Sequence, residues 1–352
     1  MEPFSIANLV RENIRRLVPY SSARDEFSGP ARIFLDANEN SLGSPLVKWY
    51  NRYPDPLQLK LKDAIGQIKG IDPIHLFLGN GSDECIDILY RAFCNPGVDN
   101  VIINPPTYGM YEVCAGINDI EVRPVRLTTD FQIDLQQVFD LVDARTKLIW
   151  ICSPNNPTGN AIARADIEML LNNFHGLVVI DEAYINFSRY RSFLQELPDY
   201  PNLVVLQTLS KAWGLAGLRL GMAFADPAII SVYNRVKPPY NVNQATQELA
   251  LEALSHTEEV NAMIRHLVDM REELAKSLLT LGPVRKVFPS ETNFLLVQIE
   301  DARAVYHYLL EKGIVVRDRS HVALCEGCLR ITVGSESENR ELITALKAVP
   351  SR

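Results

Sequence analysis

The sequence is short of positive charge. Its 35 Lys and Arg residues are outnumbered by 43 Asp and Glu residues, which leaves a formal net charge of −8 at pH 7. Contacts with a nucleic-acid backbone or an anionic membrane surface need clustered Lys and Arg, so we expect neither nucleic acid nor a membrane as a partner. Small molecules are the ligands that this charge balance favours.

Long apolar runs are also missing. Runs such as LVVI at residues 177–180 have the length of a buried strand and are far too short to span a bilayer. The first twenty residues carry an acid at Glu2 and lack the unbroken apolar core of a signal peptide. Their apolar spacing instead predicts an amphipathic helix over residues 6–17, capped by Ser5. We therefore expect a cytoplasmic protein.

The six cysteines show no framework of close, even spacing, and a chain of 352 residues needs no disulfides to hold a core. We expect them to be reduced. Cys325 and Cys328 form a CxxC with His321 four residues before it, but a structural zinc takes four ligands and no second pair is in sight. We expect no metal site, and a turn near Gly327 is favoured over a zinc-bound interaction module.

Short apolar runs alternate with segments of helical spacing between about residues 70 and 240. This alternation predicts an α/β fold in which a mainly parallel sheet is covered on both faces and binds its ligands outside the carboxyl ends of the strands. Residues 244–281 predict one or two long helices that lead away from the sheet. The expected strands are 75–79, 100–105, 119–125, 147–154, 176–184, 202–210 and 218–225.

We expect three parts in the chain. Residues 1–30 form an N-terminal helix or arm that packs on the small domain or on a partner subunit. Residues 31–245 form the large domain, and residues 246–352 form a smaller α/β domain in which strands alternate with two helices.

Polar residues follow several of the predicted strands. GNGSDE at 79–84 is a Gly-rich turn that opens a helix, whose unpaired amides could seat a phosphate, although such a turn is also ordinary. SPNNPTG at 153–159 holds Asn156 rigidly, either as a donor to a ligand oxygen or as part of a plain loop. Asp181 follows four apolar residues, so its carboxylate needs a cationic partner unless it caps a helix.

The stretch TLSKAWGLAGLRLG at 208–221 sets Lys211 among small and apolar residues. Desolvation disfavours the ammonium form there and frees a nucleophilic amine. Arg219 in a Leu-Arg-Leu strand is expected to be buried and paired. An amine, a carboxylate, an amide and an anion seat at equivalent strand ends meet the needs of pyridoxal 5′-phosphate, whose aldehyde, ring nitrogen, ring oxygen and phosphate each require one of them.

Nine stretches across nearly the whole chain resemble the motifs of fold-type I pyridoxal-phosphate enzymes, and more narrowly of histidinol-phosphate aminotransferases. As a set they are highly specific. They are LDANEN (35–40), RYPDP (52–56), GNGSDE, PTYGMY (106–111), SPNNPTG, DEAY (181–184), TLSKAWGLAGLRLG, TNFLLV (292–297) and LRITVG (329–334). The resemblance implies a seven-stranded large domain and amino transfer between L-histidinol phosphate and 2-oxoglutarate, giving imidazole acetol phosphate and glutamate in histidine biosynthesis.

The resemblance also implies a role for each residue that matches a motif. Lys211 would form the Schiff base and shuttle the proton, and Asp181 would pair with the pyridinium. The remaining cofactor contacts would be Asn156 and Tyr184 at the ring oxygen, Tyr108 on the ring face, and Ser82, Asp83, Ser210, Arg219 and, as a helper, Thr208 at the phosphate. Tyr53 would reach the cofactor phosphate of a neighbouring subunit, which implies a homodimer with shared active sites.

Substrate recognition would fall to Arg330 and Arg317, with Tyr20 and Asn38 nearer the entrance. Strand alternation in LRITVG puts Arg330 on the face opposite its apolar neighbours, so its side chain can reach a site while the strand stays anchored. A guanidinium binds carboxylate or phosphate with a two-pronged fork. For Arg317, an exposed charge at a strand end is an equally open interpretation.

Other functions share much of this pattern. Threonine-phosphate decarboxylases also bind a phosphate group of their substrate, and aromatic aminotransferases have the same fold and most of the cofactor residues. A pyridoxal-phosphate-binding regulator without turnover normally carries a DNA-binding segment. We do not expect one here, because few residues stand before LDANEN and the net charge is acidic.

Overall fold

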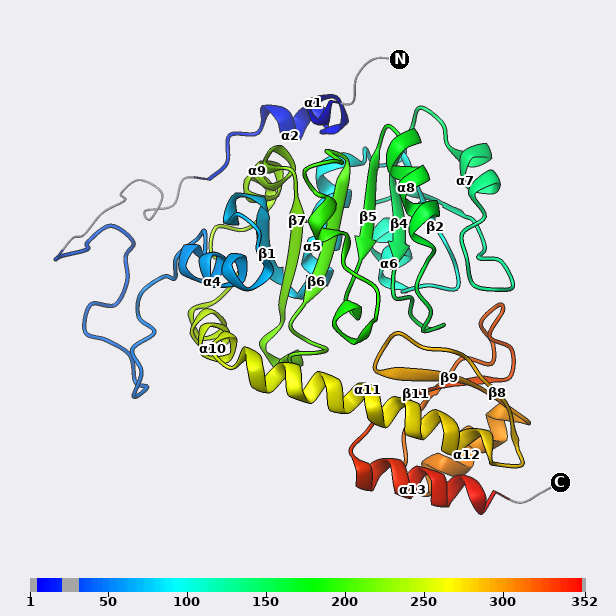
Figure 1. The fold of residues 1–352 in the computed structure, drawn as a ribbon. Helices are drawn as coiled ribbons and strands as arrows, with labels where there is room; N and C mark the ends of the chain where they lie inside the picture. The colour runs from blue at the N-terminus through cyan, green and yellow to red at the C-terminus, as the bar shows by residue number, and fades with distance from the viewer. Residues whose placement is uncertain (1–4, 21–31, 350–352) are drawn as a thin grey trace.

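The protein is described by a computed structural model that covers residues 5–20 and 32–349 (Figure 1). Its larger sheet has seven strands in the order β1-β7-β6-β5-β4-β2-β3, and only β7 runs antiparallel to its neighbours. The strands are β1 Leu76–Asn80, β2 Asn100–Ile103, β3 Glu121–Pro124, β4 Thr146–Cys152, β5 Leu177–Asp181, β6 Leu203–Thr208 and β7 Leu220–Ala225. They lie where the sequence predicts strands, so the mainly parallel α/β fold is confirmed.

Both faces of this sheet are buried at its central strands, which are apolar on both sides, whereas the edge strand β3 is partly exposed. In β5, Val178 and Ile180 belong to one hydrophobic cluster, and Leu177 and Val179 to the other. The first face is covered by α4 Leu59–Lys69, α7 Leu135–Leu141 and α8 Arg164–Asn173. The second is covered by α5 Gly81–Phe93, α6 Met110–Ile117 and α9 Pro227–Val236. By the same alternation, Asp181 at the end of β5 points to the second face.

The N-terminal segment departs from the single helix that the sequence predicts. It forms two short helices, α1 Ile6–Leu9 and α2 Glu12–Arg16, and Ser5 makes no side-chain cap. The chain breaks between them because Arg11 donates its backbone N–H to Ala92 O and its side chain to Arg91 O. The apolar residues of both helices pack beside α5 and α9 of the large domain, and not on the small domain (Figure 1).

Two helices lead from the large domain to the small one, as the sequence predicts. They are α10 Gln244–Leu254 and α11 Thr257–Leu279, and Figure 1 shows α11 extending from α10, below the large domain, to the small domain. The small domain has an antiparallel sheet in the order β10-β11-β9-β8. Its elements are β8 Val284–Val287, β9 Phe294–Ile299, α12 Ala302–Glu311, β10 Arg317–Asp318, β11 Cys328–Thr332 and α13 Glu336–Lys347.

The hydrophobic clusters follow this division only in part. Val260 and Ile264 in the first turns of α11 pack with the large-domain core, whereas Met270 and Leu274 pack with the small domain. One rigid helix therefore belongs to both cores and fixes the sheets relative to each other. The boundary between residues 245 and 246 stays a prediction. Among residues 5–20 and 32–349, no helix is long and apolar enough to cross a membrane.

Candidate active site

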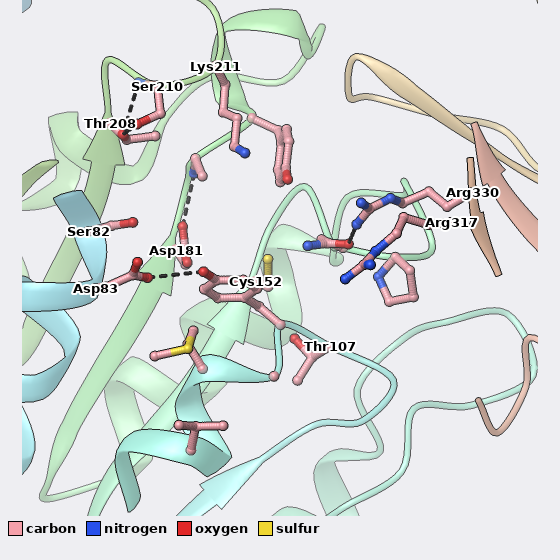
Figure 2. A pocket seen from close by; sticks show the side chains of 18 of the residues that line it. Ser82, Asp83, Thr107, Cys152, Asp181, Thr208, Ser210, Lys211, Arg317 and Arg330 are labelled. Atoms are coloured by element: carbon pink, nitrogen blue, oxygen red, sulfur yellow. Dashed lines mark hydrogen bonds between the residues drawn. The ribbon is translucent and has the colours of Figure 1, made fainter. Parts of the chain in front are cut away.

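The carboxyl ends of β1, β4, β5 and β6 and the start of β7 meet at one edge of the large sheet. There they border a cavity of about 610 Å³ that is closed on the other side by residues of the small domain (Figure 2). Of the predicted site residues, Tyr20, Asn38 and Tyr53 do not line this cavity. The others do: Ser82, Asp83, Tyr108, Asn156, Asp181, Tyr184, Thr208, Ser210, Lys211, Arg219, Arg317 and Arg330. Sheet topology thus gathers groups that are far apart in sequence.

Asp181 is a carboxylate buried at the floor of this cavity, with 2% of its surface exposed. Its Oδ2 accepts a hydrogen bond from Tyr111 Oη at 2.8 Å, and its Oδ1 accepts one from the Ala183 N–H at 3.0 Å. Burial raises the pKa of Asp181, and these two donors oppose that rise. No ion pair reaches it within the described parts of the chain, so a ligand with a protonated ring nitrogen fits as its missing cationic partner.

Lys211 lies in the loop after β6 with its side chain open to the cavity (Figure 2). Its Nζ is 5.7 Å from the centre of the Tyr184 ring. Desolvation is the largest cause that lowers the pKa of Lys211, and the charges of Arg330 and Arg219 act in the same direction. The amine is therefore biased toward its neutral, nucleophilic form.

An anion seat lies beside Lys211, at the turn from β1 into α5. Gly81 begins the helix at a φ of +72°, and its N–H donates to Arg219 O at 2.7 Å. The turn can lie against β7 only because Gly221 has no side chain: a Cβ there would be 2.2 Å from Gly81 C and Ser82 N. The start of α5, together with the Ser82, Thr208 and Ser210 hydroxyls, offers donors to a phosphate group.

Asp83 and Arg219 are partners at the edge of this seat. Arg219 Nη2 is 3.4 Å from Asp83 Oδ2, and Tyr108 Oη donates to Asp83 Oδ1 at 3.0 Å. The prediction that Arg219 is buried in a strand is wrong, because the residue caps the 3₁₀ helix η4 (Ala216–Leu218) just before β7 and leaves 52% of its side chain exposed. Its guanidinium is accordingly accessible to a ligand.

Asn156 joins the two sides of the cavity. It is buried, and its Oδ1 accepts a hydrogen bond from Arg330 Nη1 at 2.5 Å, which leaves its Nδ2 as the donor group of the amide. Tyr184 packs edge-on against Phe294 at 5.3 Å between ring centres, and burial raises the pKa of its hydroxyl, so it stays a donor. The large and small domains therefore meet at these contacts.

Three guanidinium groups of the small domain face the cavity. Arg317 of β10 pairs in register with Arg330 of β11, and both side chains are seen in Figure 2. Arg319, which directly follows β10, lines the same cavity. None of the three forms an ion pair with a carboxylate in residues 5–20 and 32–349. Burial lowers the pKa of Arg330, and the positive charges of Arg319 and Arg317 add to this effect. Such unpaired positive charge favours an anionic ligand group.

Comparison with known proteins agrees with this geometry. The model of class I and II aminotransferases matches residues 47–346. The chain belongs to this aminotransferase family. The histidinol-phosphate aminotransferase of Parabacteroides distasonis is 54% identical over 97% of this chain and 98% of the relative, and that of Cytophaga hutchinsonii is 51% identical over 98% and 99%. The family resemblance is confirmed, and with it the pyridoxal 5′-phosphate cofactor.

Solved structures share the fold of this aminotransferase. The histidinol-phosphate aminotransferase from Clostridium acetobutylicum has a TM-score of 0.78 at 24% identity and covers 85% of this chain and 91% of that one. The pyridoxal-5′-phosphate complex of the enzyme from Sinorhizobium meliloti has a TM-score of 0.76 at 23% identity, over 84% and 82%. An L-threonine-O-3-phosphate decarboxylase from Porphyromonas gingivalis has a TM-score of 0.72 at 24% identity, over 85% and 90%. At these identities the likeness establishes the fold.

Three predicted site residues of the aminotransferase are not brought to the cavity. Tyr53 and Asn38 line a separate open hollow of about 560 Å³, where Tyr53 stacks on Tyr240 with 4.4 Å between ring centres. Tyr20 is 76% exposed and lies away from both hollows. In the described chain, none of these three residues lines the cavity that holds Lys211.

The structure also adds residues that sequence reasoning missed. Arg319 could have been found by extending the strand alternation from Arg317, and Cys152 by extending the alternation of β4. Tyr111 stands in the quoted PTYGMY motif, but nothing in the sequence points its hydroxyl at Asp181. The further lining residues are Thr107, Gly109, Met110, Val113, Pro157, Ala183 and Val322.

The cysteines of the CxxC lie apart from this chemistry. Cys325 and Cys328 are both buried as free thiols, and burial raises the pKa of Cys325 to about 12 and that of Cys328 to about 11. In the part of the chain that the structure describes, no three His, Cys, Asp or Glu side chains are grouped to hold a metal ion.

Proposed function

We propose that this aminotransferase transfers the amino group between L-histidinol phosphate and 2-oxoglutarate, giving imidazole acetol phosphate and glutamate as a step of histidine biosynthesis. The observation that carries the proposal is the group of three unpaired arginines facing Lys211 across the cavity. A phosphate monoester carries up to two negative charges, which suit three guanidinium groups better than the single charge of a carboxylate does. The names of the similar chains support the same substrate.

Different residues of the cavity bind the ring nitrogen, the ring oxygen, the ring face and the phosphate of the cofactor. Bound pyridoxal phosphate supplies an electron-accepting ring and an aldehyde carbon that bonds covalently to amines. Asp181 holds the proton of the ring nitrogen, Asn156 and Tyr184 donate to the ring oxygen, and Tyr108 packs on the ring face. Ser82, Thr208, Ser210, Arg219 and the Asp83 amide hold the phosphate. The Asp83 carboxylate itself is occupied by Arg219 and Tyr108 and so does not face the phosphate as a free charge.

Lys211 is the group that moves protons. In its neutral form, Nζ would remove the proton from the substrate carbon that bears the amino group, and as an ammonium it would hold that proton ready to be given back. The lowered pKa of Lys211 keeps a larger share of the amine neutral at physiological pH. The Asp181 carboxylate would hold the proton on the ring nitrogen, and the cofactor ring would then be a stronger electron acceptor.

Arg330 and Arg317 bind the substrate phosphate, and Tyr20 and Asn38 lie nearer the entrance in the assembled enzyme. Arg330 is held in place by Asn156 Oδ1 and by the face of Phe294, whose ring centre is 5.2 Å from the guanidinium carbon. A fixed phosphate anchor of this kind places the amino group of a substrate of one length at the Lys211 amine. Shorter or uncharged substrates lose that alignment.

The functional unit is a cytoplasmic homodimer. Large apolar side chains such as Leu35, Leu42 and Trp49 are exposed along residues 32–59 of the single chain, and a second copy would cover them. Tyr53 lies on this same surface and would reach the cofactor phosphate of the other subunit. The N-terminal arm of residues 1–30 partly lies outside the described residues, and its contact with a partner subunit belongs to the same proposal.

The test is the absorption spectrum of the protein with bound pyridoxal phosphate, before and after addition of L-histidinol phosphate without an oxo acid. We expect the visible band of the cofactor to give way to the near-ultraviolet band of pyridoxamine phosphate. O-phospho-L-threonine and L-histidinol, which lacks the phosphate, serve as comparison substrates. Release of carbon dioxide from O-phospho-L-threonine, or equal conversion of histidinol with and without phosphate, would overturn the assignment.

A further inference from the structure

Tyr111 is a fully buried tyrosine that touches two of the residues assigned to the cofactor without lining the cavity itself. Its hydroxyl donates to Asp181 Oδ2 at 2.8 Å. Its ring meets the ring of Tyr108 edge-on, with 5.6 Å between centres and 84° between planes. It therefore contacts both the partner of the ring nitrogen and the ring that packs on the cofactor face.

The position of Tyr111 is rigid. Its ring stacks on Trp150 at 4.8 Å with 14° between planes, and Trp150 stacks in turn on Tyr90. Tyr90 Oη donates to the backbone oxygen of Tyr111 at 2.7 Å. Burial raises the pKa of the Tyr111 hydroxyl well above its ordinary value, which favours the protonated form that donates a hydrogen bond.

Asp181 needs such a donor because its surroundings disfavour its charge. Burial raises its pKa, Asp83 raises it further, and Lys211 is the one charge that lowers it among the largest causes. The Ala183 N–H occupies the other carboxylate oxygen. Four thiols and hydroxyls of the described chain also interact with the Asp181 charge, and burial raises the pKa of each, which favours its neutral form: Cys85, Cys152, Tyr108 and Tyr184.

We propose that Tyr111 is a positioning residue of the cofactor site, whose hydroxyl keeps Asp181 ionised and whose ring holds Tyr108 against the cofactor face. The proposal rests on the assignment of Asp181 and Tyr108 in the proposed function. Tyr111 does not touch the ring nitrogen itself, and its effect on that nitrogen passes through the Asp181 carboxylate. An ionised Asp181 pairs with a protonated ring nitrogen, whereas a neutral carboxylic acid does not.

The test is Tyr111→Phe, which keeps the ring and its stacking but removes the hydroxyl. We expect the apoprotein to bind pyridoxal phosphate about 10- to 100-fold more weakly, as for loss of a hydrogen bond to a charged group. Because the pKa of Asp181 rises, the loss of affinity on acidification should begin at a higher pH than in the wild type. We also expect a lower kcat with an unchanged KM for L-histidinol phosphate, since the small-domain arginines are untouched.

Tyr233→Phe is the matched control, because Tyr233 is as buried as Tyr111 and its hydroxyl donates to Cys85 O at 2.9 Å and not to Asp181. It should lower the melting temperature as Tyr111→Phe does, but leave the pH midpoint of cofactor binding unchanged. Asp181→Asn separates this proposal from the proposed function. If Asp181→Asn weakens binding and Tyr111→Phe keeps the wild-type pH midpoint, the role of Tyr111 is refuted alone. If neither variant changes binding, the assignment of Asp181 fails and the role of Tyr111 fails with it.

Discussion

Charged side chains of both signs share the cavity with Lys211, and they act together with desolvation on the charge of its amine. Arg330 and Arg219 lower its pKa after desolvation, while Asp181 and Asp83 oppose them. Arg330 therefore has two effects in the proposed reaction. It binds the anionic end of the substrate, and it disfavours the ammonium form of the residue that must accept a proton.

Replacing Arg330 by Gln is expected to raise the pKa of Lys211, because a positive neighbour is removed. An amine reacts above its pKa, so the pH at which the apoprotein combines with pyridoxal phosphate at half its maximal rate moves upward. The KM for L-histidinol phosphate should also rise about 10- to 100-fold, as for loss of a charged hydrogen bond of roughly 1.5–3 kcal/mol. Stopped-flow absorption and steady-state kinetics measure the two effects.

Arg340→Gln provides the control for this substitution. Arg340 lies on α13 with an exposed side chain, and its ion-pair partner Glu336 is 3.7 Å away and equally exposed. It should leave both the pH midpoint and the KM at their wild-type values. A midpoint that stays in place in Arg330→Gln would mean that desolvation alone sets the charge of Lys211.

For single residues, the sequence predicts the position in the site well where that position follows from the end of a strand. Lys211, Asp181 and Asn156 stand directly after apolar runs, and parallel strands bring such positions to one edge. Arg219 was mispredicted as buried because its environment depends on a 3₁₀ turn that ends one residue before β7. Tyr111 was missed because its hydrogen bond joins α6 to β5, and helical spacing carries no information on that pairing.

The elements around the anion seat are packed more tightly than their sequence patterns indicate. The turn into α5 lies against the first residues of β7, and its backbone occupies the space that a side chain at residue 221 would need. The seat is thus built from two elements that are far apart in sequence. Its geometry depends on a glycine that donates nothing to a ligand.

Gly221→Ala is expected to displace the turn, because the new Cβ would meet backbone atoms of Gly81 and Ser82 that cannot rotate away. Overpacking of this kind costs about 1–3 kcal/mol of stability. The displaced Ser82 amide should also weaken binding of pyridoxal phosphate about tenfold, roughly the 1.4 kcal/mol of one hydrogen bond. Thermal unfolding of the apoprotein and titration with the cofactor measure the two quantities separately.

Gly116→Ala in α6 is the control, since a Cβ there has no atom within 4 Å and its φ is not positive. It should be neutral or slightly stabilising, because alanine favours a helix over glycine. If Gly221→Ala lowers stability and leaves cofactor affinity intact, the turn is structural and the phosphate lies elsewhere.

The sequence predicts elements reliably where their own residues decide them. The central strands of the large sheet, such as β4 to β7, consist mostly of apolar residues, and α10 and α11 lack Gly and Pro, so local composition is sufficient there. The N-terminal helix is the counterexample. Its apolar spacing is helical throughout, but the hydrogen bonds from Arg11 to the end of α5 divide the segment into two short helices. The spacing within residues 5–17 contains no information about a hydrogen-bond partner that is 80 residues away.

At the scale of the whole molecule, the cavity is a joint product of two domains. The large sheet supplies Lys211 and Asp181, the small sheet supplies Arg317 and Arg330, and α11 belongs to both cores. What one chain does not supply is Tyr53, which stacks on Tyr240 in a separate hollow. The proposed sharing of active sites between two subunits can be tested with two defective chains.

A hybrid dimer of a Lys211→Ala chain and a Tyr53→Ala chain is expected to recover about half of the wild-type activity, because one of its two sites then has both intact residues. Two different affinity tags, purified in sequence, isolate the hybrid for assay. The control carries both substitutions on one chain, paired with a wild-type chain. There the site that keeps Lys211 receives the defective Tyr53, so this dimer should have only the low activity of Tyr53→Ala. If instead the control has the higher activity of the two hybrids, Tyr53 serves the site of its own chain and the active sites are not shared.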